Sequence, residues 1–98
     1  MDRRGSTYRW SALRWKVLAF PRAADATAAL GGRVTAGALG PVDRDEVDDV
    51  YVLRSIDGVK GRFVIEVAAA DASGAPPLCP DAKLGALAAR LLERLPAH

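Results

Sequence analysis

Residues 47–70, VDDVYVLRSIDGVKGRFVIEVAAA, form the densest run of β-branched and aromatic residues in the chain and predict the centre of its fold. Such residues favour β-strands. The dipeptide Asp57-Gly58 within the run is a strong hairpin signal, because a two-residue type I′ turn needs positive φ angles that Asp and Gly tolerate. We therefore expect two antiparallel strands joined at this dipeptide, with Ile56 opposite Val59.

This register divides the hairpin side chains between two faces, because alternate residues of a strand share a face. The face expected in the core is apolar and consists of Val50, Val52, Ile56, Val59, Phe63, Ile65 and Val67. The other face is mixed and expected to be half exposed, with Tyr51, Leu53, Ser55, Lys60, Arg62, Val64 and Glu66. Since an isolated hairpin is only marginally stable in water, the flanking segments should supply further strands and helices.

Residues 8–20, YRWSALRWKVLAF, fit either a strand or a helix. A strand would point one set of side chains to the core, Leu13, Trp15, Val17 and Ala19. It would point the other set outward, Tyr8, Trp10, Arg14 and Lys16. A helix would align Trp10, Leu13, Val17 and Phe20 in one stripe. We expect the strand, because tryptophan, valine and phenylalanine favour it.

The segments on either side of the hairpin complete the expected fold. After Pro21, residues 22–30 predict a short alanine-rich helix that ends at Gly31-Gly32, and residues 33–39 predict a second strand. The acidic residues 43–49, DRDEVDD, should lead into the hairpin as a loop. Residues 1–6 are expected to be disordered.

The end of the chain predicts a linker over residues 71–80 and a helix over residues 81–95, which stops before Pro96. Four leucines lie at helical spacing on that helix: Leu84, Leu87, Leu91 and Leu95. Their burial against the sheet would contribute roughly 1.5–3 kcal/mol each before entropy costs. The same stripe could also be an interface between two helices, although two heptads are too few to indicate a coiled coil.

The expected fold is a single domain over residues 1–98 with the element order β-α-β-β-β-α. This order is typical of an α+β two-layer sandwich with about four mainly antiparallel strands, and we expect both helices on one face of the sheet.

Composition limits the classes of function. Cys79 is the only cysteine and His98 the only histidine, so no zinc cluster, other metal site or cofactor is indicated. No apolar run approaches the roughly 20 residues of a membrane span, and a cytoplasmic location is the default expectation. Residues 1–22 hold six cations against one acid, and residues 43–49 hold five acids against one arginine. Such separated charges can steer the encounter with a partner.

Sequence signals for catalysis are weak. None of the four serines lies in a nucleophile-elbow context. The glycine-rich residues 31–40 follow a helix and precede a strand, whereas a phosphate-binding loop needs the reverse order. The acids of residues 43–49 lack the spacing of a calcium loop. A non-enzymatic protein is therefore expected.

The best candidate site is the outward side of the first strand, with Tyr8, Arg9, Trp10, Arg14 and Lys16. Aromatic and arginine side chains are common anchors of protein interfaces. Alternating rings and cations also suit single-stranded nucleic acid. In a third interpretation, Trp10 is half buried under a helix and the cations are simply solvated.

We expect a small interaction or accessory-subunit module that binds a protein partner, associates with itself, or does both. If the first strand lies at the sheet edge, its backbone could accept a strand from another chain. A nucleic-acid-binding domain is the first alternative. The second is a small-molecule-binding or enzymatic domain with a site between subunits.

Overall fold

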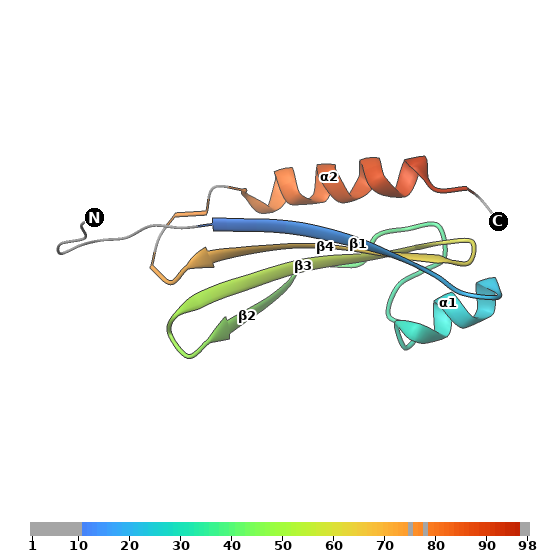
Figure 1. Cartoon of the computed structure of the whole chain (residues 1–98), viewed down its shortest axis with the longest axis horizontal. Coiled ribbons are helices and arrows are strands. Elements are labelled where there is room, and N and C mark those ends of the chain that lie inside the picture. The colour runs from blue at the N-terminus through green and yellow to red at the C-terminus, as the bar shows by residue number, and fades with distance from the viewer. Residues whose placement is uncertain (1–10, 75, 78, 97–98) are drawn as a thin grey trace.

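A four-stranded antiparallel sheet with the strand order β1-β4-β3-β2 forms the centre of the computed structural model (Figure 1). The structure describes residues 11–74, 76–77 and 79–96. Its elements are β1 (Ser11–Ala19), α1 (Ala23–Ala29), β2 (Asp43–Val47), β3 (Tyr51–Lys60), β4 (Phe63–Ala72) and α2 (Asp81–Arg94). The α+β class and the order β-α-β-β-β-α are confirmed.

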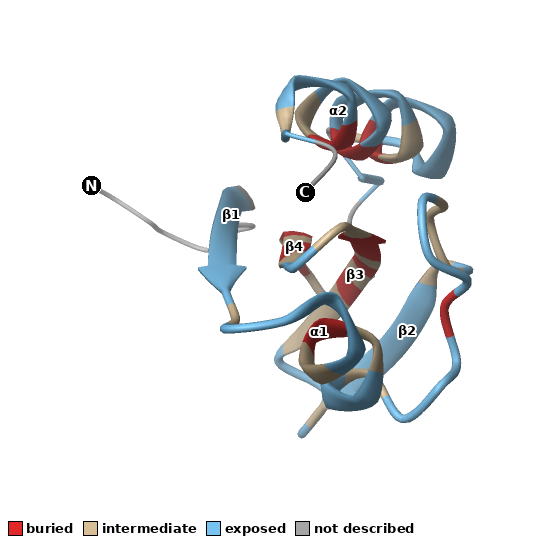
Figure 2. Ribbon diagram, turned by 90° about the vertical axis from the view of Figure 1, so that its right-hand side faces the viewer, coloured by how far each residue is buried: buried red, intermediate tan, exposed pale blue. Residues whose placement is uncertain are grey.

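The two helices lie on opposite faces of the sheet, so the expectation that they share one face is wrong (Figure 2). The larger core lies under α2 and contains Ile56, Ile65, Val67, Ala69, Leu84, Ala88 and Leu92. A smaller core lies toward α1 and contains Ala26, Val34, Val59 and Val64. Because alternate residues of β3 and β4 point to opposite faces, both faces carry apolar side chains, and each needs a cover.

The chain reverses at Gly61 and Arg62, and the turn predicted at Asp57-Gly58 is wrong. Lys60 lies opposite Phe63, and Gly58 lies inside β3 opposite Ile65. Gly61 has a φ of 58°, which fits the first central position of a type II′ turn. The longer pairing brings Ile56 opposite Val67 under α2 and turns Val59 to the α1 side.

Gly58 serves helix packing. A Cβ at this position would lie 2.9 Å from a Leu39 side-chain carbon and 3.2 Å from atoms of Ile65 and Leu92. These contacts are closer than ordinary van der Waals distances, and the missing side chain lets α2 and the loop before β2 approach the sheet. Close apolar packing, and not a turn, therefore explains why residue 58 is a glycine.

The second strand is formed by the acidic segment, and the strand predicted over residues 33–39 is wrong. Those residues form a loop that touches the sheet through an isolated bridge between Leu39 and Gly58. The acidic residues Asp43–Val47 pair with β3 as β2. Their side chains are mostly exposed, since an edge strand can satisfy its backbone on one side and keep its charges in water.

The remaining boundaries are close to those expected. The helix predicted over residues 22–30 is α1, and the helix predicted over residues 81–95 is α2. Because β4 continues to Ala72, the linker begins two residues later than residue 71. The predictions for residues 1–6 and for the start of the first strand lie outside the described residues. No described helix has both the length and the apolar character needed to cross a membrane.

Candidate functional site

The outer side of β1 is an open sheet edge within the described part of the chain. β1 pairs only with β4 there, and β4 is paired on both sides. The Phe20 backbone N–H donates to the Arg62 carbonyl at 2.9 Å, which continues the β1–β4 register. Even-numbered residues of β1 therefore direct their backbone N–H and C=O groups to β4. Leu13, Trp15 and Val17 direct theirs outward.

The apolar side chains of β1 lie on the face predicted for the core, but the core does not cover them. Trp15 is 62% exposed, Leu13 48% and Val17 44%. Figure 2 shows the reason, because α2 lies over β3 and β4 and leaves β1 outside its footprint. A strand of this composition places large hydrophobic surface next to unpaired backbone groups.

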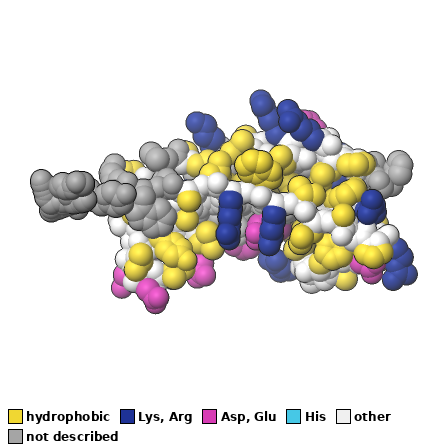
Figure 3. Space-filling model, viewed as in Figure 1, with side chains coloured by type: hydrophobic (Ala, Val, Ile, Leu, Met, Phe, Trp, Pro, Cys, Tyr) yellow, Lys and Arg dark blue, Asp and Glu magenta, His cyan; other side chains and the backbone are white. Residues whose placement is uncertain are grey.

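A groove of about 270 Å³ lies between β1 and α2. We call it the edge groove. Its lining residues are Leu13, Trp15, Val67, Leu87, Arg90, Leu91 and Arg94. Figure 3, which views the β1 side, shows hydrophobic side chains in a band with Lys and Arg side chains along its borders. The groove is thus apolar inside and cationic at its rim.

The residues predicted for the site lie partly on the other face of the same strand. Arg14 lines a shallow hollow of about 180 Å³ with Tyr51 and Leu53. The Lys16 Nζ lies 3.6 Å from a Glu66 carboxylate oxygen across the β1–β4 pair. Tyr8, Arg9 and Trp10 lie outside the described residues. Arg14 and Lys16 therefore flank the open edge from the side opposite the edge groove.

The leucine stripe considered as a helix interface packs mainly on the chain's own sheet. Leu84 is fully buried, and Leu91 and Leu95 pack against the same core. Leu87 is 37% exposed and lines the edge groove. Leu91 also lines this groove, but Leu87 is the more exposed of the two.

Sequence reasoning missed Trp15, Arg90 and Arg94 as site residues, and it considered Leu87 only as part of a possible interface between two helices. The alternation of side chains along the strand predicted the correct face of the sheet for Trp15. The exposure of the Trp15 side chain, however, depends on the position of α2. A usable signal was present on the helix, because residues 83, 87, 90 and 94 share one side, and three of them are cationic. That side borders the groove.

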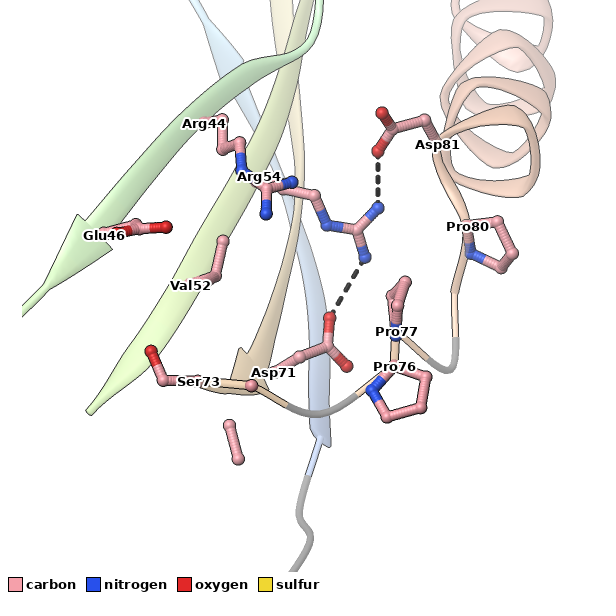
Figure 4. A pocket seen from close by; sticks show the side chains of 12 residues that line it. Arg44, Glu46, Val52, Arg54, Asp71, Ser73, Pro76, Pro77, Pro80 and Asp81 are labelled. Atoms are coloured by element: carbon pink, nitrogen blue, oxygen red, sulfur yellow. Dashed lines mark hydrogen bonds and ion pairs between the residues drawn. The ribbon is translucent and has the colours of Figure 1, made fainter. Parts of the chain in front are cut away.

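A second and larger cleft of about 560 Å³ lies between β2, β3 and the start of α2 (Figure 4). Arg54 points into it from β3 and is only 3% exposed. Its guanidinium lies 3.1 Å from an Asp71 oxygen and 2.6 Å from an Asp81 oxygen, and it also donates to the Cys79 carbonyl. These bonds tie β3 to β4 and to the first turn of α2.

The charge of Arg54 is well compensated. Burial alone would lower the pKa of Arg54, but hydrogen bonds to Asp81 and Asp71 and the charges of both carboxylates raise it above its ordinary value. The guanidinium donates hydrogen bonds to three acceptors, so the role of Arg54 is to stabilise the contacts among β3, β4 and the start of α2. Among the described residues, no group of three or more metal-binding side chains is present.

No protein-family model matches the chain, and no curated protein or solved structure is significantly similar to it. What the site does must therefore be inferred from its own geometry and chemistry.

Proposed function

We propose that this domain is a non-enzymatic interaction module that binds a protein partner through the open edge of β1. The observation that carries the proposal is the coincidence of outward backbone groups and exposed apolar side chains at Leu13, Trp15 and Val17. Unpaired N–H and C=O groups of an edge strand can pair with a strand from another chain. Burial of the adjacent side chains would add affinity.

The chemistry of the edge groove suits binding. Among the described residues, its lining combines five apolar side chains with two arginines and includes no carboxylate, histidine, cysteine or hydroxyl group. Such a lining can bury a partner's apolar groups and attract negative charge. It offers no pair of groups for nucleophilic attack or proton transfer.

The test removes one outward N–H group from β1. Proline at residue 17 loses the N–H that points away from β4, and an edge strand tolerates that loss. Val17→Ala is the matched control, because it shortens the same side chain and keeps the N–H. Each variant is immobilised and exposed to extract of the source cells, and bound proteins are identified by mass spectrometry.

We expect a partner to bind the wild-type chain and Val17→Ala but not Val17→Pro. Circular dichroism should show that both variants remain folded. A partner that binds Val17→Pro as well as Val17→Ala would contradict strand pairing at β1.

Single-stranded nucleic acid is a second candidate ligand, supported by the face that carries Arg14 and Lys16. Arg14 and Tyr51 line the same hollow, so a cation and a ring are adjacent there. A base can stack on the ring while the phosphate meets the cation. The capture experiment separates the two functions if the bound material is also assayed for nucleic acid, whose retention should fall steeply as salt is raised.

A further inference from the structure

We infer that the segment recognised by β1 is an extended strand in which apolar and acidic residues alternate. The inference rests on the proposed function, because it names the chemistry of the partner that pairs with the open edge.

The two faces of β1 differ in chemistry, and an added strand would meet both. On the α2 side it would lie beside Leu13, Trp15 and Val17 and the edge groove. On the other side it would lie beside Ala12, Arg14, Lys16 and Leu18, and the Leu18 side chain is 45% exposed. Directly opposed side chains on one face of a sheet are close enough to interact. One face of the added strand should therefore be apolar, and the other should carry acidic residues opposite Arg14 and Lys16.

The inner neighbour of β1 shows this pattern around Lys16, although Ala68 lies opposite Arg14 and Val64 lies opposite Leu18. On β4, Ile65 and Val67 lie opposite Val17 and Trp15, and Glu66 lies opposite Lys16. The Lys16–Glu66 ion pair measures 3.6 Å. Side chains of β1 can contact both β4 and a strand added on the outer side. An added strand with the same pattern would therefore make contacts like those that β4 makes with β1.

The arginines of α2 increase the preference for negative charge. Arg90 and Arg94 lie at the rim of the edge groove, and no carboxylate of the described part of the chain lines it. Arg14 and Lys16 lie on the other face of β1. Figure 3 shows Lys and Arg side chains on both sides of the hydrophobic band. A cationic partner would meet like charges on either side of β1.

Segments of this chain fit the edge poorly. Residues 1–10 carry three arginines and one aspartate. Two β1 strands paired about a two-fold axis centred on any residue from 13 to 17 would bring Arg14 or Lys16 opposite or diagonal to the same cations of the second copy. In β2, Arg44 and Glu46 occupy one face and Asp43, Asp45 and Val47 the other, so neither face is apolar.

The experiment measures the binding of three synthetic peptides of about nine residues, the length of an ordinary strand. Valine alternates with glutamate in the first, with threonine in the second and with lysine in the third. The full chain carries Trp10→Phe, so that tryptophan fluorescence reports Trp15 alone. Coverage of Trp15 should shift its emission to shorter wavelength.

We expect the glutamate peptide to bind about tenfold more tightly than the threonine peptide, and the lysine peptide to bind most weakly. Arg14→Ala should weaken binding of the glutamate peptide about threefold. Arg44→Ala is the matched control, because it removes an exposed arginine from the opposite edge strand, and it should leave the affinity unchanged. Added salt should reduce the difference between the peptides.

Other outcomes distinguish the two levels of the proposal. If the threonine or lysine peptide binds as tightly as the glutamate peptide and Val17→Pro abolishes that binding, strand pairing stands and the acidic partner is wrong. If binding of the glutamate peptide survives Val17→Pro, or no peptide binds, both proposals are overturned. A second copy of the chain that competes with the peptide for β1 would also overturn the acidic partner.

Discussion

Arg54 shows how one residue can decide the arrangement of three elements. It stands among apolar neighbours on the side of the sheet under α2, yet its guanidinium bridges Asp71 of β4 and Asp81 of α2. Removal of one member of a buried ion pair commonly costs about 3–5 kcal/mol, because the other charge stays behind without compensation. The Arg54–Asp71 pair is buried on both sides, whereas the Asp81 side chain is 60% exposed.

Asp57 is the second unusual charged residue of β3. Burial raises the pKa of Asp57 above its ordinary value, and the negative charge of Glu66 adds to this effect. Arg33 opposes it through a 3.4 Å ion pair, while Asp43 contributes further repulsion. The folded protein therefore binds a proton at Asp57 more tightly than the unfolded chain does.

This shift predicts a pH dependence of stability. As pH rises from near 3.8, the ordinary pKa of the group, through the raised pKa, the contribution of Asp57 to the free energy of unfolding should fall, because the folded state then loses a proton that it holds more tightly. Asp57→Asn cannot titrate. Its free energy of unfolding, relative to wild type, should increase across that window and then level off.

Urea denaturation of both proteins between about pH 3 and about pH 8 measures the difference directly. A constant difference across the range would mean that folding does not alter the proton affinity of Asp57.

At the scale of elements, the position of α2 decides both the core and the edge groove. The helix lies over β3 and β4, where its buried face meets Ile56, Ile65 and Val67. Its neighbouring side faces the space above β1, which no described element fills (Figure 2). The same helix thus supplies a stabilising face and a binding face.

Two leucines of α2 separate these roles. Leu84→Ala should lower the free energy of unfolding by about 2–5 kcal/mol, because Leu84 is fully buried and its loss leaves a cavity. Leu87→Ala should lower it by less than about 1 kcal/mol and weaken binding at the edge groove. Thermal and urea denaturation measure the first effect and peptide titration the second. Equal losses of stability would show that the groove is part of the core.

At the scale of the whole molecule, charge is divided between the two edges of the sheet. β1 carries Arg14 and Lys16, and the opposite edge strand β2 carries Asp43, Asp45 and Glu46. The strands run roughly along the long axis of the molecule (Figure 1). Charges on an exposed edge strand discourage pairing between identical chains.

The cations of β1 should therefore limit self-association. Arg14→Thr/Lys16→Thr keeps strand-forming residues and removes the repulsion, so this variant should dimerise at concentrations where the wild-type chain does not. Arg22→Thr/Arg44→Thr, with the same change of charge away from β1, is the control. Sedimentation velocity at about 0.15 M salt measures the masses. If the two variants associate equally, Arg14 and Lys16 do not limit pairing between copies of the chain.

The candidate site was only partly predictable from the sequence. Strand alternation correctly separated Arg14 and Lys16 from Leu13, Trp15 and Val17, because the face of a side chain depends only on its position along the strand. Exposure depends on what covers that face. The exposed state of Trp15 follows from the placement of a helix more than 60 residues away in the chain.

The sequence alone determined the α+β class, the element order, and the extents of α1 and α2 to within about one residue. Helical periodicity, capping glycines and runs of β-branched residues are local signals, so they suffice for local structure. The tertiary structure decided that the turn lies at Gly61, that the acidic segment forms β2, and that α2 leaves β1 uncovered. Each of these three features depends on which strand pairing and helix position bury the most apolar surface in the whole fold. That total cannot be read from a residue and its neighbours in the sequence.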